Sequence, residues 1–186
     1  MIPRLDLLSD SSRSALALAC ATKVSPYFSK RFPDQAETLT STLDECWRVV
    51  LKGSSINVNW DVILQEAEEA VPTSMDEPEA GPAIPAGEAA LCALDATIES
   101  TPENTYEAIS AAYTAVEMSS FLSMYPPDQD HGSIDVKELN ARMKKVCETA
   151  VVIEFNRFLD QLIARVEAGA GPAEIRGLGD GASSSR

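Results

Sequence analysis

Residues 35–52, QAETLTSTLDECWRVVLK, carry the pattern that decides the fold class. The apolar residues recur at i, i+4, i+7, i+8 and i+11, which places them on one face of an α-helix. They are Leu39, Leu43, Cys46, Trp47 and Val50. Gly53 follows, and glycine is typical of a helix end. The stretch therefore predicts an amphipathic helix that packs one side on a core.

The same period recurs on both sides of this stretch. It predicts five more helices, at about 10–32, 59–71, 88–100, 102–125 and 134–168. The last one is long, and its second half is expected to be the more central. No strand-like alternation of useful length occurs. We therefore expect an all-α, single-domain bundle of about six helices with a long C-terminal helix.

Proline and glycine mark the expected interruptions. Asp10 or Ser11 is a candidate cap for the first helix, and Pro26 predicts a break or a new first turn within it. Residues 72–87 hold four prolines and two glycines, which predict a loop. We expect the bundle to span residues 1–176 and the Gly/Ser-rich residues 177–186 to form a flexible tail.

The composition limits the function classes. There are 29 acidic and 15 basic residues, a net charge of −14, so neither nucleic acid nor an anionic membrane is an expected partner. No apolar run reaches the length of a membrane span, and the chain is expected to be cytoplasmic. The four cysteines are widely spaced and there is one histidine, so we expect small buried thiols and no metal or cofactor site.

The most unusual feature is a gap in the positive charges. Residues 53–136 contain sixteen acids and no Lys or Arg. This charge either keeps the protein soluble, steers a basic protein towards it, or binds a metal ion. Glu66 and Glu69 share a helix face at i, i+3, with Glu68 rotated away. The candidate partner-binding residues are Glu66, Glu69, Asp76, Glu77, Glu79, Asp128 and Asp130.

Catalytic motifs are not evident. The loop 126–134 has acids and a glycine, but no register gives an EF-hand its oxygen ligands, Gly132 and Glu138 together. We predict a helix-joining turn there, and an exposed His131 in place of a catalytic base. The sequence nominates no catalytic residue.

Several short segments resemble one family. They are Ala17-Leu18-Ala19-Cys20, Leu43-Asp44-Glu45-Cys46-Trp47, Val58-Asn59-Trp60-Asp61 and Glu68-Glu69-Ala70-Val71-Pro72. As a set they resemble the YjaG-like family of bacterial proteins, a domain-of-unknown-function family, over about residues 5–165. The resemblance implies an all-helical fold and no established catalytic residues.

Three functions fit these observations. The first is an acidic helical module that binds a basic protein, such as an immunity protein that neutralises a cationic toxin. The second is an enzyme or a metal- or ligand-binding protein that uses the central carboxylates. The third is a regulatory homo-oligomer, such as a homodimer, with the long final helix as the contact. We favour the first, because the positive-charge gap is its most direct sequence signal.

Overall fold

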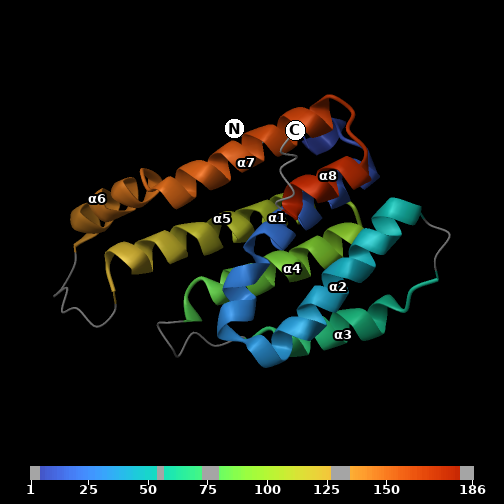
Figure 1. Cartoon of the computed structure of the whole chain (residues 1–186), viewed down its shortest axis with the longest axis horizontal. Coiled ribbons are helices and arrows are strands. Elements are labelled where there is room, and N and C mark those ends of the chain that lie inside the picture. The colour runs from blue at the N-terminus through green and yellow to red at the C-terminus, as the bar shows by residue number, and fades with distance from the viewer. Residues whose placement is uncertain (1–4, 54–56, 73–79, 127–134, 181–186) are drawn as a thin grey trace.

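The structure, a computed structural model, describes residues 5–53, 57–72, 80–126 and 135–180. Every regular element in these ranges is a helix, and every helix contributes to one hydrophobic core (Figure 1). The all-α prediction is confirmed, but eight α-helices replace the expected six or so. The elements are η1 (Leu5–Leu7), α1 (Asp10–Arg31), α2 (Pro33–Lys52), α3 (Trp60–Ala70), α4 (Ala83–Ile98), α5 (Pro102–Met124), α6 (Val136–Cys147), α7 (Ala150–Glu167) and α8 (Pro172–Gly179).

Helix α1 is the centre of the bundle. It contacts α2, α4, α5, α7 and α8, and all residues from Ser14 to Ala21 are buried. These residues are mostly alanine and leucine on every side of the helix, as expected for a helix that is surrounded by others. Small alanines let the neighbouring helices approach α1 closely.

The expected break at Pro26 is wrong, because α1 continues through it to Arg31. Proline lacks the N–H that would bond the carbonyl of Thr22, four residues earlier. The Ser25 hydroxyl donates to that carbonyl instead, over 3.0 Å. The cap is Ser9, one residue before the expected Asp10, since the hydroxyl of Ser9 accepts the Ser12 N–H at 3.3 Å.

The expected loop at 72–87 is too long, because α4 already begins at Ala83. Pro85 falls in the first turn, where a helix does not need the missing N–H. Gly87 lies where a Cβ would be 2.9 Å from Val71 Cγ1 and 3.0 Å from Phe28 Cε2. Glycine is therefore needed there for close packing of α4.

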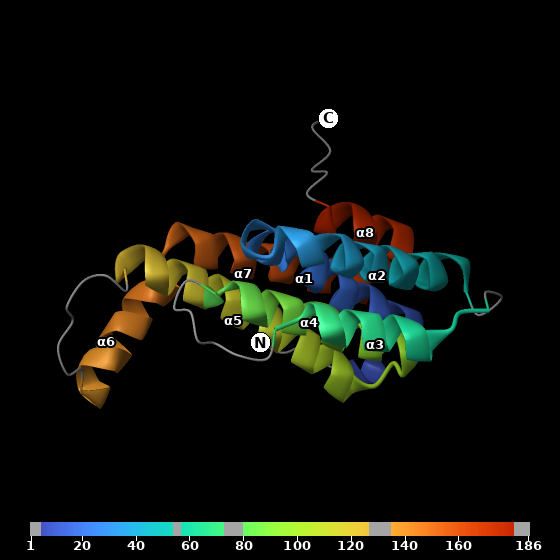
Figure 2. The ribbon, with the colours of Figure 1, turned by 90° about the horizontal axis from the view of Figure 1, so that it is seen from below.

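The expected long final helix is two helices, α6 and α7. Helix α6 ends at Cys147, and Thr149 has an extended backbone with φ −72° and ψ 149°. The Thr149 hydroxyl lies 3.2 Å from Ser120 Oγ on α5 and donates to Val146 O at 2.7 Å. Figure 2 shows the result, in which α7 lies along the bundle and α6 turns away from it.

Helix α8 crosses the expected boundary between residues 176 and 177. Gly179 is buried, and a Cβ there would lie 3.1 Å from Ala19 Cα. Residues up to Gly179 thus belong to the packed bundle. The last six residues of the predicted tail, 181–186, lie outside the described residues.

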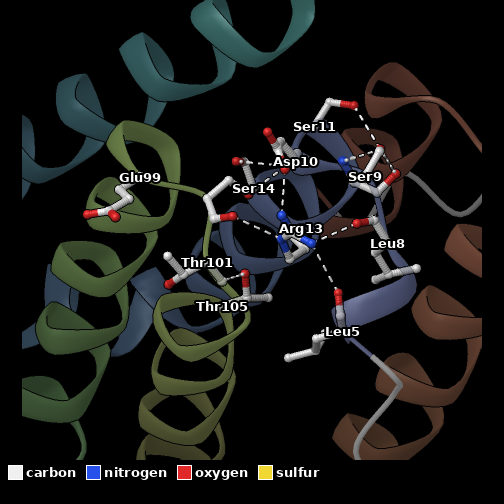
Figure 3. A network of polar contacts seen from close by, with 12 residues as sticks. Leu5, Leu8, Ser9, Asp10, Ser11, Arg13, Ser14, Glu99, Thr101 and Thr105 are labelled. Atoms are coloured by element: carbon white, nitrogen blue, oxygen red, sulfur yellow. Dashed lines mark hydrogen bonds and ion pairs between the residues drawn. The ribbon is translucent and has the colours of Figure 1, made fainter.

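Hydrogen bonds from Arg13 link the beginning of α1 to the η1 segment and to the connection between α4 and α5 (Figure 3). Its guanidinium donates to Leu8 O at 2.7 Å, Leu5 O at 3.2 Å and Ser100 O at 3.0 Å, and it pairs with Asp10. The carbonyls belong to η1, to the residue just after it, and to the connection between α4 and α5. The Leu5 carbonyl also accepts the Leu8 N–H at 3.2 Å, so Arg13 is the donor that matters most for the Leu8 and Ser100 carbonyls.

Candidate functional site: an acidic groove between α2 and α3

A groove of about 490 Å³ separates part of α2 from α3. Four of its lining residues are carboxylates, three carry hydroxyls and one is apolar, so the groove favours a cation. We call it the acidic groove. It is lined by Asp34, Glu37, Thr38, Ser41, Thr42, Glu45, Ile63 and Glu66.

The groove follows from two polar stripes. On α2, Asp34, Glu37, Ser41 and Glu45 recur at i, i+3, i+7 and i+11, opposite the apolar stripe that meets the core. The partner helix α3 contributes Ile63 and Glu66 at i, i+3, while its Ala67 and Ala70 are buried. The groove thus lies between the solvent-facing edges of two helices whose other faces are packed.

Most of the negative charge in the groove has no basic partner. Arg48 pairs with Glu45, and its hydrogen bond lowers the pKa of that carboxyl. Among the residues that the structure describes, no ion pair involves Asp34, Glu37 or Glu66. Three carboxylates therefore remain available to an external cation.

A second group of acids lies across α3, α4 and α5. Glu88, Asp95 and Glu107 lie close enough to Cys92, and Glu68 and Glu107 close enough to Asp95, to repel their charged forms, and we call these four acids the acidic cluster. Burial, and then repulsion from Glu68 and Glu107, raises the pKa of Asp95. Burial and three of these acids raise the pKa of the Cys92 thiol to about 11. The cluster therefore concentrates negative charge on a second part of the surface.

The sequence-predicted residues separate in the structure. Glu66 lines the acidic groove, whereas Glu69 is an exposed α3 residue that accepts a hydrogen bond from Gln65 Nε2 at 2.9 Å. Glu68, expected to be rotated away from them, belongs to the acidic cluster. Asp76, Glu77, Glu79, Asp128 and Asp130 lie outside the described residues.

Sequence reasoning missed the contribution of α2. Asp34, Glu37 and Glu45 lie outside the positive-charge gap, so a search for acids within 53–136 passed over them. Their i, i+3, i+11 spacing on a helix with a known core face was the available signal. The spacing could not show that α3 forms the opposite wall of the groove.

The acids of the positive-charge gap face outward. Of the eleven that the structure describes, all except the half-buried Glu117 are exposed, and none is in an ion pair between described residues. The exposed ones are Asp61, Glu66, Glu68, Glu69, Glu88, Asp95, Glu99, Glu103, Glu107 and Asp135. Between described residues, no flanking arginine or lysine folds back to pair with these exposed acids.

Other candidate chemistry can be placed as well. Within the described ranges no group of three or more His, Cys, Asp or Glu is arranged to hold a metal ion, and His131 lies outside them. Cys20 and Cys46 are buried as expected, but Cys147 is exposed and contacts Glu117 Oε1 at 3.8 Å. None of the helices described here has the length and apolar character needed to cross a membrane.

Comparison with known proteins places this fold. The profile of DUF416, described as a protein of unknown function, matches residues 2–168. The chain belongs to the DUF416 family. The resemblance to an uncharacterised family is thereby confirmed, while the YjaG-like name for it stays a prediction.

One solved structure shares the DUF416 fold. It is the crystal structure of a DUF416 family protein from Shewanella baltica OS155 at 1.91 Å resolution. The two structures match with a TM-score of 0.68 and 18% sequence identity, over 94% of this chain and 89% of that chain. No curated protein matches the sequence.

Proposed function

We propose that this DUF416 protein is an acidic helical protein-binding module, and that its acidic groove receives lysine or arginine side chains of a basic partner protein. The observation that carries the proposal is the groove itself, with Asp34, Glu37 and Glu66 free of ion pairs among the described residues. Its hydroxyls can accept hydrogen bonds, and Ile63 can cover the methylene stem of a lysine.

The rest of the surface supports the same partner chemistry. The exposed acids of α3, α4 and α5 extend the negative potential beyond the groove, and the net charge is −14. Such a field raises the association rate with a cationic protein and disfavours acidic ones. Glu66 and Glu69 are the described members of the partner surface predicted from sequence. Asp76, Glu77, Glu79, Asp128 and Asp130 complete that proposal.

An immunity protein is the kind of module we favour. Such a protein neutralises a basic toxin, such as a nuclease, by covering its cationic surface, and it needs no catalytic group of its own. An acidic helical bundle with an open acidic groove meets that requirement. Work inside the producing cell would place the protein in the cytoplasm.

The first experiment measures binding of a fluorescent oligolysine peptide by anisotropy, with an oligoglutamate peptide as the negative probe. Glu37→Lys/Glu66→Lys should weaken oligolysine binding at least about tenfold, because two free carboxylates become cations. Glu103→Lys/Glu154→Lys makes the same change in net charge away from the groove and should weaken it only about twofold. Equal losses in both variants would reject the groove as the site.

The second experiment tests the immunity interpretation in cells. The protein is co-expressed with a cationic gene product encoded beside its own gene, and growth is followed. Wild-type protein should restore growth that the neighbour suppresses, and Glu37→Lys/Glu66→Lys should restore it much less. If wild-type protein has no effect on growth while it still binds oligolysine in vitro, the immunity interpretation is wrong and the binding module stands.

A further inference from the structure

Helix α6 is a basic element on an acidic protein. Its twelve residues hold four of the fifteen basic residues of the chain and one acid, Glu138. Lys137, Lys144 and Lys145 are exposed, and no ion pair between described residues involves them. The helix therefore presents an unpaired positive face to solvent.

The same helix leaves apolar side chains uncovered. Val146 is its only buried residue, whereas Val136 is 74% and Leu139 is 44% exposed. These residues lie towards the N-terminal half of α6, which projects from the end of the bundle (Figure 2). Leu139 shares the face of Val146, seven residues later, whereas Val136 lies at the edge of the lysine face. A charged face with an exposed apolar residue at its edge is the composition of a docking helix.

Local contacts hold α6 in this position. The Asp135 carboxylate caps its first turn by accepting the Glu138 N–H at 2.7 Å. The Arg142 guanidinium pairs with Glu138 and lies 4.6 Å from the centre of the Tyr125 ring at the end of α5. Because Lys137 and Lys144 are seven residues apart, their Cα atoms are about 10 Å apart on the same side of a preformed helix.

We propose that α6 of one copy docks in the acidic groove of a second copy of this chain. The charges are complementary, with three free lysines on α6 and three free carboxylates in the groove. The exposed Val136, which precedes Lys137, can approach Ile63, the apolar residue of the groove. This inference rests on the proposed function, because it uses the same groove.

The contact must be made between copies. Helix α6 lies at one end of the molecule and α2 and α3 lie elsewhere in both views, so a chain cannot place its own α6 in its own groove (Figures 1 and 2). One helix of twelve residues covers less surface than the roughly 800 Å² per partner of a stable complex. The association is therefore weak and reversible, and a basic partner protein displaces it.

A charge-swap experiment tests this contact. Variant A is Lys144→Glu/Lys145→Glu and variant B is Glu37→Lys/Glu66→Lys, and each is measured by sedimentation velocity with increasing protein concentration. Wild-type protein should self-associate, and each variant alone should associate at least about tenfold more weakly, because like charges then face each other. An equimolar mixture of A and B should regain association, since α6 of each variant then meets a groove of opposite charge on the other variant.

The mixture also controls for net charge. Variant A gains four negative charges and variant B loses four, so a mixed pair keeps the total charge of two wild-type copies. Work at about 0.1 M salt, where the Debye length is about 10 Å, separates the local contact from long-range repulsion. Monomeric wild-type protein at every concentration, or a mixture that associates no better than its components, would overturn the inference.

Oligolysine binding separates this inference from the proposed function. Variant A keeps the groove and should bind oligolysine like wild-type protein, whereas variant B should not. If B loses oligolysine binding but A and B fail to associate, only the docking of α6 is wrong. If B binds oligolysine like wild-type protein, the proposed function itself fails.

Discussion

Helices α6 and α7 come from one stretch of similar amphipathic pattern but have different surroundings. Helix α7 buries Val152, Phe155, Phe158, Leu162 and Val166 along its whole length. Helix α6 buries Val146 alone. The comparison shows that an apolar stripe identifies the helix face that can be buried. It does not show whether other helices of the same chain cover that face.

The cause of the difference lies at the junction. The extended backbone at Thr149 turns α6 away from the axis of α7, so only the second half of α6 remains against the bundle. Val136 and Leu139 stay exposed, and the lysines of α6 are in no ion pair with described acids. A break of two residues thus leaves part of an apolar stripe uncovered within the described chain.

The largest expected effect comes from Leu162, which is fully buried on α7. Leu162→Ala should lower the free energy of unfolding by about 2–5 kcal/mol, through lost burial and the cavity that remains. Leu139→Ala, at the 44% exposed position on α6, should change it by about 0.5 kcal/mol or less. Urea denaturation followed by circular dichroism measures both. Comparable losses would mean that α6 is packed like α7.

Two arginines give the next comparison, since both side chains are only 12% exposed. Arg13→Ala removes the Arg13 donor from the Leu8 and Ser100 carbonyls and should cost about 2–3 kcal/mol. Arg142→Ala removes one ion pair and a ring contact, and within the described residues its Nη1 has no hydrogen-bond partner. That change should cost about 1 kcal/mol. Urea denaturation of both variants checks which loses more free energy of unfolding. A larger loss for Arg142→Ala than for Arg13→Ala would contradict the prediction.

Helix α8 tests how closely the end of the bundle is packed. Gly179→Ala places a methyl group against the Ala19 backbone and should destabilise the protein by about 1–3 kcal/mol. Gly177→Ala is the control in the same helix, because nothing lies within 4 Å of its added Cβ. It should stabilise by up to about 1 kcal/mol through helix propensity. Thermal unfolding would show equal effects if α8 were loosely attached.

The smallest effect concerns the acidic cluster. Burial, and then repulsion from Glu68 and Glu107, raises the pKa of Asp95, so folding favours its protonated form. This contribution is fully present below the unfolded pKa of about 3.8, and is lost as pH rises through the higher folded value. Asp95→Asn should therefore raise the free energy of unfolding by about 0.3–0.5 kcal/mol at pH 7.

The pH dependence of this gain is the check. Denaturation curves of wild type and Asp95→Asn should converge below about pH 3.8, where Asp95 is protonated in both states. Asp160→Asn, at an exposed position on α7, is the matched substitution outside the cluster and should not show this gain. A gain at Asp95 that persisted at low pH would point to packing in place of charge.

Much of the fold could be predicted because helix signals are local. The stripe at 39–50 and the Gly53 end act within a few residues, and both are confirmed. Two failures had different causes, one within the same turn and one in distant residues. Pro26 needed a hydroxyl from Ser25 to stay helical, and Gly87 needed Val71 and Phe28 as neighbours to show its purpose.

The candidate site, like the fold, depends partly on local sequence and partly on packing. Amino-acid order alone established the helical class, the excess of acid and the missing positive charge at 53–136, because composition and a short period need no three-dimensional information. Packing selected which carboxylates share a groove, since Asp34 and Glu37 meet Glu66 only when α3 lies against α2. It also left α6 uncovered, because whether a helix face finds a partner depends on the direction in which the chain leaves the core.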